Sequence, residues 1–240
     1  MAIQEQTLVL LTVITITKDD VGLERTLKSL AAQRMKPFQF ILVNGGHEIV
    51  LERTYGEEDT VITEPDRGLY DAMNKGIAAC RGSHMLFLNA GDELTDELST
   101  QTIADHLAAN RITNFALEVG DTRGRRWRLP ATAPKHQGMV FPYDRDPIIY
   151  NASMKVYADG HYIAEMRRRY PEQFVDLVAV RFYLGGISSN PSLRLVVTAF
   201  REAGVQEALK KLFLWLSSCL VGHEITRTAI YSYRRYERLR

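Results

Sequence analysis

The segment from Glu64 to Asp92, EPDRGLYDAMNKGIAACRGSHMLFLNAGD, constrains the fold of this chain more than any other part of the sequence. It begins with a polar turn at Asp66, Arg67 and Gly68, and apolar residues then recur at helical spacing from Leu69 to Cys80. A short apolar run, Met85 to Leu88, is bounded by turn residues and is typical of a buried strand. The segment therefore predicts a loop, a helix, a strand and an acidic turn.

Apolar, β-branched runs alternate with helical patterns along the first half of the chain. We expect strands at Val9 to Ile16, Phe38 to Val43 and Thr60 to Thr63, and helices at Val21 to Gln33 and Asp96 to Ala109. Such alternation indicates βα units and a largely parallel sheet. From 113 to 142 the segments become short and strand-like, and the last fifty residues become helical again. The pattern predicts an α/β fold with a mixed, mostly parallel sheet flanked by helices.

The acidic turn offers a site for a divalent cation. Asp92 follows the strand that ends at Leu88, and ligands of α/β sheets bind at the carboxyl ends of strands. Gly91 lets the backbone approach a ligand closely, and oxygen-rich side chains suit a hard cation that bridges phosphate oxygens. An alternative role for Asp92 is that of a helix N-cap or turn residue.

The same segment resembles the inverting glycosyltransferases of the GT-A fold, family 2, and in particular the small bacterial enzymes of exopolysaccharide and colanic-acid-type assembly. In that family a phrase like EPD-x-G-IYDAMNKGI, followed by FLN-x-GD, is a recurrent signature, and here it stands almost intact. The resemblance extends more thinly over roughly residues 8 to 190. It implies a Rossmann-like GT-A domain over residues 1–190 and leaves 191–240 as a helical extension.

The resemblance implies a donor site for a nucleoside diphosphate sugar, such as a UDP- or GDP-sugar, with Mn²⁺ or Mg²⁺ bound at Asp92. The residues implied in donor binding are Thr15, Thr17, Asn44, Asp66, Arg67, Asp71, Asn74 and Asn89. Three positions depart from the family pattern: Asn44 stands where Asp is common, and the turn has Asn89 and Gly91 where carboxylates are common. Each of these polar residues could instead be a turn residue or a solvated charge near a helix start.

Inverting transfer needs a general base that takes a proton from the acceptor hydroxyl. The segment YNASMKVYADGHYIAEM resembles the family's late acidic motif, a strand-like approach followed by Asp and a helix, and places Asp159 at the position of the base. His161 and Glu165 are further candidates. A capping role for Asp159 stays open, because this residue precedes the expected helix.

Two further motifs resemble family positions that contact an acceptor or a phosphate. The first holds His136 and Gln137, in APKHQGMVFP, and the second is a GG-[VI]-S loop with Gly186 and Ser188. The alternatives are a hydrogen-bonded histidine at a strand entrance and a simple turn of the chain.

Composition narrows the possible functions of the chain and its expected cellular location. The chain has 30 Lys and Arg against 29 Asp and Glu, a net charge of +1, so nucleic-acid binding driven by phosphate contacts is not expected. Cys80 and Cys219 lack metal or redox spacing, as in cytosolic proteins, and the N-terminus has no basic leader region. The expected location is cytoplasmic. The C-terminal tail, residues 223–240, holds aromatics and the arginines Arg227, Arg234, Arg235, Arg238 and Arg240. These leave open a peripheral contact with the inner face of the membrane.

The expected function is therefore a metal-assisted glycosyltransferase of polysaccharide biosynthesis, with a glycan or lipid-linked glycan as acceptor. The run from Leu209 to Val221 is too short for a membrane span, and we expect it to pack on the catalytic domain or to lie at a membrane interface. Two rival functions stay open. One is a catalytically silent module that binds a nucleotide or a partner, and the other is a sugar nucleotidyltransferase, although the first strand lacks that enzyme's glycine-rich, basic loop.

Overall fold

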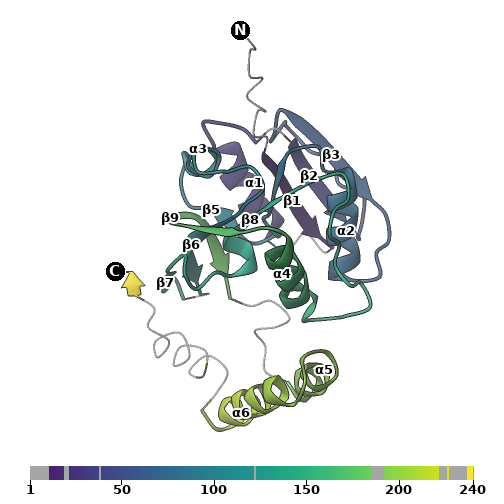
Figure 1. Ribbon diagram of the computed structural model, residues 1–240, viewed down its shortest axis with the longest axis vertical. Coiled ribbons are helices and arrows are strands. Elements are labelled where there is room, and N and C mark those ends of the chain that lie inside the picture. Colours follow the sequence, from purple (N-terminus) through teal and green to yellow (C-terminus); the bar gives the residue numbers. More distant parts are fainter. Residues whose placement is uncertain are drawn as a thin grey trace.

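A computed structural model describes residues 11–18, 22–37, 39–121, 123–184, 192–221, 226 and 237–239. Its elements are shown in Figure 1. In chain order they are β1 (Leu11–Thr17), α1 (Leu23–Ala31), β2 (Gln39–Asn44), β3 (Glu58–Thr63), α2 (Leu69–Ala79), β4 (His84–Phe87), β5 (Glu93–Leu94), α3 (Ser99–Asp105), β6 (Ile112–Gly120), β7 (Arg126–Leu129), a 3-10 turn (His136–Gly138), β8 (Met139–Pro142), α4 (Ala158–Arg169), β9 (Glu172–Tyr183), α5 (Leu193–Ala203), α6 (Val205–Val221) and β10 (Glu237–Leu239).

The strands form one mixed sheet in the order β10-β7-β6-β8-β4-β1-β2-β3, with β9 pairing β5 and β6. Strands β4, β1, β2 and β3 are parallel, so their carboxyl ends meet at one edge. Strand β8 joins this half antiparallel to β4, and the second half is mostly antiparallel. The predicted α/β fold with a mixed sheet is confirmed, and its parallel part coincides with the βα pattern in the sequence.

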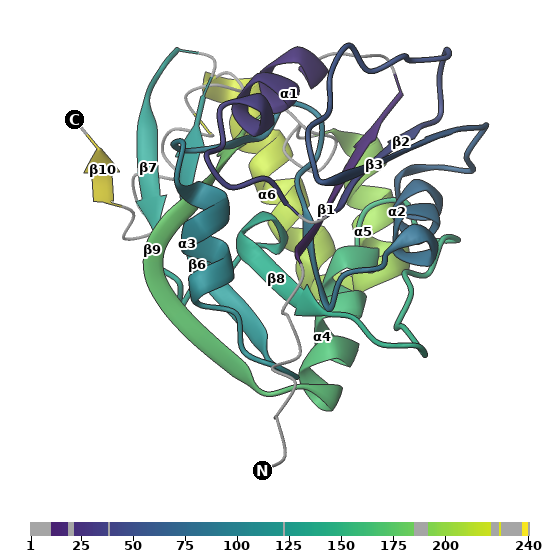
Figure 2. The same ribbon diagram turned by 90° about the horizontal axis from the view of Figure 1, so that it is seen from above.

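Alternating side chains of the central strands feed two separate cores. On β1, Val13 belongs to the core under α1 and α3, whereas Ile14 belongs to the core under α2 and α4. The same alternation places Leu42 in the first core and Val43 in the second. Figure 2 shows the helices on both sides of the twisted sheet. A sheet covered on both faces explains why these strands read as continuous apolar runs.

Several boundaries differ from the sequence prediction. The helix expected at 96–109 is shorter, α3 (Ser99–Asp105), and the helix expected at 21–33 is α1 (Leu23–Ala31). The approach to Asp159 is a loop rather than a strand, since no strand lies between β8 and α4. Strand β9, which pairs with β6 in parallel, was not predicted.

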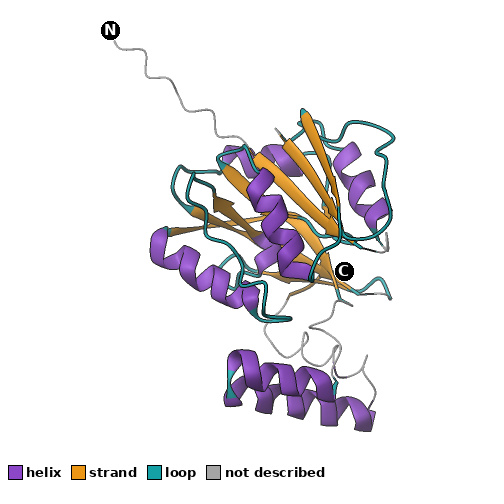
Figure 3. Ribbon diagram, turned by 90° about the vertical axis from the view of Figure 1, so that its right-hand side faces the viewer, coloured by secondary structure: helices purple, strands orange, loops and turns teal. Residues whose placement is uncertain are grey.

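The helices α5 and α6 form a hairpin that lies apart from the sheet, at the bottom of Figure 3. The hairpin is attached to the loop before α4 through the Glu202 carboxylate. This group accepts hydrogen bonds from the backbone N–H groups of Lys155 (2.9 Å), Val156 (3.0 Å) and Tyr157 (3.2 Å). These N–H groups lead into the start of α4, whose N-cap Tyr157 makes no side-chain capping bond. A negative charge at a helix N-terminus is favourable, so Glu202 both satisfies these donors and fixes the hairpin. The helical character expected after residue 192 is present in these two helices.

Candidate functional site

A cleft of about 660 Å³ opens at the carboxyl edge of the parallel strands. It is lined by Ile16, Thr17, Lys18, Asp66, Arg67, Gly68, Leu69, Ala72, Asn89 and Ala90. The strand register explains the convergence, because Thr17 at the end of β1 lies opposite Asn44 at the end of β2, which lies opposite Thr63 at the end of β3. Four residues of the predicted donor site therefore share one wall: Thr17, Asp66, Arg67 and Asn89.

Two glycines after β2 let the loops pack tightly behind this cleft. A Cβ atom on Gly45 would lie 1.8 Å from the Asp66 carboxylate, and one on Gly46 would lie 1.9 Å from the Lys18 carbonyl oxygen. Asp66 in turn accepts a hydrogen bond from the Gly68 N–H at 2.9 Å. The GG pair thus brings the loop after β2 against the ends of β1 and β3.

Asn89, which lines this cleft, carries a side-chain oxygen without a hydrogen-bond donor in the described part of the chain. Its Oδ1 atom is buried and makes no hydrogen bond within the described residues. Buried polar oxygens in proteins are nearly always hydrogen-bonded, so an isolated one beside a cleft marks a place for a ligand donor group or a cation. This is the observation that most directly indicates binding at the cleft.

Four other predicted donor residues do not line the cleft and form hydrogen bonds within the protein; the first two are Thr15 and Asn44. Thr15 is buried and its hydroxyl donates to the Leu88 carbonyl (2.7 Å), which ties β1 to the end of β4. The buried Asn44 binds the backbone of its own loop, with Nδ2 donating to the His47 carbonyl and Oδ1 accepting from Gly46 N (3.0 Å). These two side chains lie behind the cleft and outside its lining.

Asp71 and Asn74 lie on α2 and also bind protein groups. Asp71 accepts from Arg67 N (3.0 Å) and from the Arg67 guanidinium (3.1 Å), and these bonds hold the pKa of Asp71 below its usual range. Asn74 pairs with the backbone of Tyr150 through two bonds, donating to its carbonyl (2.9 Å) and accepting from its N–H (2.8 Å). Both amide atoms of Asn74 are therefore used within the protein.

We expect Asn74→Ala to lower the free energy of unfolding by about 2 kcal/mol, because it leaves two Tyr150 backbone groups without partners. For a protein of this size the melting temperature should fall by roughly 4 to 8 °C. Asn151→Ala is the matched control, since the side chain of this exposed asparagine accepts hydrogen bonds from Ser153 alone among the described residues. Differential scanning calorimetry compares the two variants, and equal melting temperatures would contradict a structural role for Asn74.

Asp92 lies close to this cleft in sequence but is not among the residues that line it. It is only 5% exposed, its Oδ1 accepts from Tyr183 N (3.2 Å), and its carbonyl accepts from the Thr26 hydroxyl (2.6 Å). Burial raises the pKa of Asp92 to about 8, while the Tyr183 N–H and the nearby Arg25 oppose the shift. Asp92 precedes β5 rather than a helix, so the N-cap alternative is excluded.

A cation at this turn would have few protein ligands. No group of three His, Cys, Asp or Glu side chains that could hold a metal occurs in the part of the chain that the structure describes. Mg²⁺, however, is commonly held by one or two carboxylates together with substrate phosphates. The free Oδ1 of Asn89 and the buried carboxylate of Asp92 fit such a sparse donor set.

Asp159 is the second residue of α4 and does not precede it. Its Oδ1 accepts from Gly160 N (2.8 Å), and the three N–H groups before the helix bind Glu202 instead. Burial raises the pKa of Asp159, and the positive charges of Lys135 and Lys211 partly oppose this effect. Glu202 thus takes over the capping role that was an alternative for Asp159.

Tyr70 connects Asp159 to the cleft. It follows the cleft residue Leu69, and its hydroxyl donates to the Val156 carbonyl (2.6 Å) just before α4. Burial and then the charge of Asp159 raise the pKa of the Tyr70 hydroxyl. The Asp159 carboxylate does not line the cleft. It acts electrostatically on Tyr70 of α2, the helix that contributes Leu69 and Ala72 to the cleft lining.

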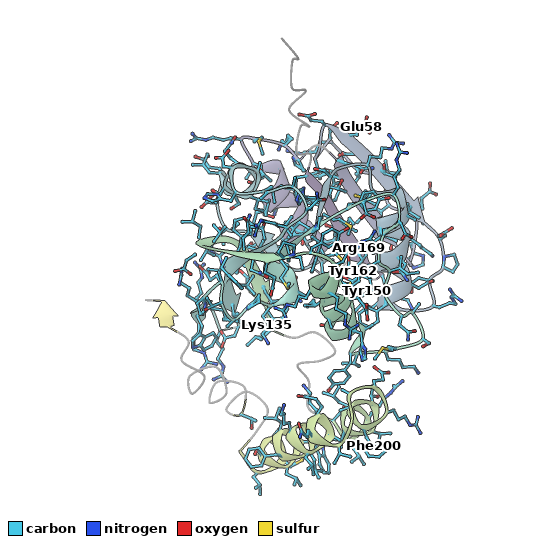
Figure 4. The ribbon with its side chains drawn as sticks, viewed as in Figure 1. Glu58, Lys135, Tyr150, Tyr162, Arg169 and Phe200 are labelled. Atoms are coloured by element: carbon cyan, nitrogen blue, oxygen red, sulfur yellow. The ribbon has the colours of Figure 1, made fainter. Side chains whose placement is uncertain are left out.

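His136 is buried within an aromatic cluster rather than in the cleft. Its Nε2 is hydrogen-bonded to the Tyr150 hydroxyl, and Tyr150 stacks on Tyr162 with ring centroids 4.1 Å apart. Burial lowers the pKa of His136 to about 4, so the ring is neutral at physiological pH. Figure 4 shows Tyr150 and Tyr162 close together near α4. Gln137 is half-buried beside it, whereas Gly186 and Ser188 lie outside the described residues.

Three contributors were missed by the sequence prediction. Tyr70, Tyr150 and Glu202 bring α2, the loop at 150–157 and α5 together, although they are far apart in the chain. Tyr70 lies inside the recognised signature and could have been singled out there. Nothing in the sequence around Glu202 indicates its partner.

Comparison with known families supports a relationship over most of this domain. The profile described as "Glycosyl transferase family 2" matches residues 12–169. An uncharacterised glycosyltransferase of Mycobacterium tuberculosis is 40% identical over 89 residues, which is 35% of this chain and 34% of that protein. A PGL/p-HBAD biosynthesis glycosyltransferase of Mycobacterium bovis is 35% identical over 75 residues, 28% of this chain and 29% of the relative. The chain thus matches only about a third of the length of these curated relatives.

Solved structures agree with the fold. TarS 1-349 of S. aureus in complex with UDP-GlcNAc superposes with a TM-score of 0.57 at 15% identity, covering 94% of this chain and 76% of TarS 1-349. The same protein without that ligand gives a TM-score of 0.57. At this identity the likeness establishes a shared architecture.

Proposed function

The chain belongs to glycosyl transferase family 2, and from this premise we propose that it moves a sugar from a nucleoside diphosphate sugar to a glycan or lipid-linked glycan, with inversion at the transferred carbon. The observation that carries the proposal is the cleft at the carboxyl edge of β1 and β4, where Asp66, Arg67 and Asn89 of the signature share one wall. Residues 1–190 would form the transferase domain and 191–240 an extension. The fold of this chain resembles that of TarS, whose complexes with UDP-GlcNAc and UDP support a nucleotide-sugar donor for this chain.

The donor would lie in this cleft with its nucleoside toward Thr17 and Lys18 and its diphosphate toward Arg67 and Asn89. Lys18 and Arg67 supply positive charge, and Arg67 is held by Asp71 with its side chain 84% exposed. Asn89 supplies a buried acceptor for a ligand hydroxyl or a cation. Asn44, Asp71, Asn74 and Thr15 act behind the cleft by holding its loops.

Asn89 and Asp92 would hold the divalent ion, Mn²⁺ or Mg²⁺. Such an ion stabilises negative charge on the departing diphosphate. Asp92 carries a pKa of about 8 because it is buried, so a bound cation would favour its ionised form. Arg25 supports the same form, and its guanidinium also stacks 4.1 Å over the Tyr183 ring.

Asp159 would take the proton of the acceptor hydroxyl. Because burial raises the pKa of Asp159 above that of an ordinary aspartate, its carboxylate is a stronger base. The Tyr70 hydroxyl, which donates to the Val156 carbonyl, ties the segment before α4 to α2. His161 and Glu165 lie further along α4, and Glu165 is paired with Arg168.

The acceptor side of the proposal is a glycan or lipid-linked glycan in a polysaccharide pathway. The relatives that match include a PGL/p-HBAD biosynthesis glycosyltransferase.

Of the helices in the described part of the chain, none has the length and apolar character needed to cross a bilayer. We place the reaction in the cytoplasm, with contact at the inner face of the membrane.

A second candidate is a silent module that binds a nucleotide without transfer. It is favoured by one observation, the poverty of metal ligands at the turn that ends in Asp92, where no three-residue metal set occurs among the described side chains.

We expect UDP to bind more tightly when Mn²⁺ is present, and Asp92→Ala to remove most of that gain. Isothermal titration calorimetry with and without Mn²⁺ measures both affinities. Asp96→Ala is the control, because Asp96 lies outside the cleft and binds only Ser99 and the backbone of Leu98 through its carboxylate. The same gain in wild type and Asp92→Ala would remove the metal role and leave Asp92 as a structural side chain.

A further inference from the structure

The hairpin of α5 and α6 exposes an apolar stripe on each helix. On α5 the stripe is Leu193, Val197 and Phe200, with Phe200 59% exposed. On α6 it consists of Val205, Leu209, Phe213, Leu216 and Leu220, with Phe213 69% exposed and Leu220 85% exposed. The spacing of three and four residues places each set on one helix face. Leu195 and Ala199 on the opposite face of α5, and Ser218 on that of α6, are buried, so the hairpin is already packed on one side.

A basic cleft adjoins the α5 stripe. It has a volume of about 720 Å³ and lies between α5 and the loop at 151–155. Its wall carries Lys155, Arg194 and Arg201, which are exposed and form no ion pair with the described residues. The acid in this wall, Glu202, is engaged by three backbone N–H groups. Three cations therefore face one hollow without a carboxylate partner.

The cleft and the stripe share a border. Arg194 and Arg201 are seven residues apart, which is about two helical turns, so they form a row beside the stripe. Val197 belongs to both surfaces, since it is 45% exposed and also lines the cleft. In Figure 4, Phe200 lies on the side of the hairpin that is turned away from the sheet. A basic row beside an apolar face is the arrangement of helices that lie in a membrane interface.

We propose that the α5–α6 hairpin docks on an anionic bilayer, with its apolar stripe among the acyl chains and a lipid phosphate in the cleft of Lys155, Arg194 and Arg201. The inference deepens the proposed function, on which it rests for the lipid-linked acceptor. It assigns membrane contact to this hairpin rather than to the arginines of the tail.

Charge favours a bilayer over a second copy of the chain. A two-fold dimer through the stripe would bring the same patch of both copies together. The basic rows that border the stripes would then face each other, and like charges across an interface are unfavourable. An anionic lipid surface complements both the apolar and the basic parts.

The test is flotation of the full chain with vesicles of phosphatidylglycerol and phosphatidylcholine, and with vesicles of phosphatidylcholine alone. We expect binding to the anionic vesicles. Arg194→Ser with Arg201→Ser should weaken it by roughly tenfold to thirtyfold, as two cations near an anionic surface would. Phe200→Ser with Phe213→Ser should weaken it at least about tenfold, since two large apolar groups are lost.

The matched controls are Arg145→Ser and Phe174→Ser, an exposed arginine and a 51% exposed phenylalanine outside the hairpin. Both should bind vesicles like the wild type, and circular dichroism checks that all variants are folded. Failure to bind anionic vesicles, or equal binding by the hairpin variants and the controls, would overturn the proposal. So would a stable dimer that Phe200→Ser with Phe213→Ser converts to a monomer. UDP affinity is measured on the same samples. If the wild type binds anionic vesicles but not UDP, the proposed function alone would be contradicted.

Discussion

Asp159→Asn should lower sugar transfer by roughly two to four orders of magnitude, because it replaces the proposed proton acceptor with a group that cannot take a proton. Asn keeps the volume of Asp, and its oxygen still accepts the Gly160 N–H, so the fold and the donor affinity should stay close to wild type. Capping would not be affected, since Glu202 serves the N–H groups before α4. Release of nucleoside diphosphate from the bound donor, measured with a lipid or glycan extract as acceptor, gives the turnover.

The control is Asp146→Asn, which removes a carboxylate that is 99% exposed in the same half of the protein. Its turnover should match the wild type. Wild-type turnover by Asp159→Asn would remove this residue from the mechanism. The acid limb of the pH profile adds a second readout: burial raises the pKa of Asp159, so activity should fall at a higher pH than an ordinary aspartate would give.

Gly46→Ala should lower the affinity for UDP by roughly tenfold or more. A Cβ at this position would lie 1.9 Å from the Lys18 carbonyl oxygen and 3.3 Å from Asn44 Oδ1, so the loop after β2 must move away from the end of β1. Forcing an extra atom into a packed site costs about 1–3 kcal/mol, and here the displaced backbone carries Lys18 of the cleft wall. Titration calorimetry gives the affinity, and thermal unfolding gives the cost to the fold.

Gly160→Ala is its control, because a Cβ there meets no atom within 4 Å and the residue lies in α4. This change should leave UDP affinity unaltered and make the helix slightly more stable. Equal UDP affinities for Gly46→Ala and Gly160→Ala would show that the loop after β2 does not shape the donor cleft.

The parallel half of the fold could be predicted because its signal is local. Each strand of this half is a short apolar run and each helix shows its own periodicity, so β1, β2, β3, α2 and β4 appear close to the expected positions. The signature segment also predicted the place of the cleft, since Asp66, Arg67 and Asn89 follow β3 and β4 at the edge of the sheet.

The second half depends on contacts that the sequence does not display. Strand β9 pairs with β6 across about sixty residues, and its sequence, EQFVDLVAVRFY, was not recognised as a strand. Asn74 and Thr15 were expected at the donor because of the resemblance to the family's donor site. Their hydrogen bonds to Tyr150 and Leu88 depend on packing between distant segments.

Asp92 illustrates the same limit at the site itself. Its position after β4 was predicted, but the direction of its side chain is set by β9, whose Tyr183 N–H binds it. Because β9 was not foreseen, neither was the burial that raises the pKa of Asp92 to about 8. The sequence identified Asp92 as a candidate, whereas its burial and its contact with β9 could not be predicted.

The central claim, that the cleft at the ends of β1 and β4 binds a nucleoside diphosphate sugar, is tested most directly by calorimetric titration of UDP, GDP and their sugars into the wild type and Asn89→Ala, with Mn²⁺ present. We expect saturable binding of at least one nucleoside diphosphate and its sugar at one site, with a marked loss of affinity in Asn89→Ala, because Asn89 lines the cleft and its buried Oδ1 has no hydrogen-bond partner among the described residues. Absence of binding by every nucleotide, or the same affinity in both proteins, would contradict it.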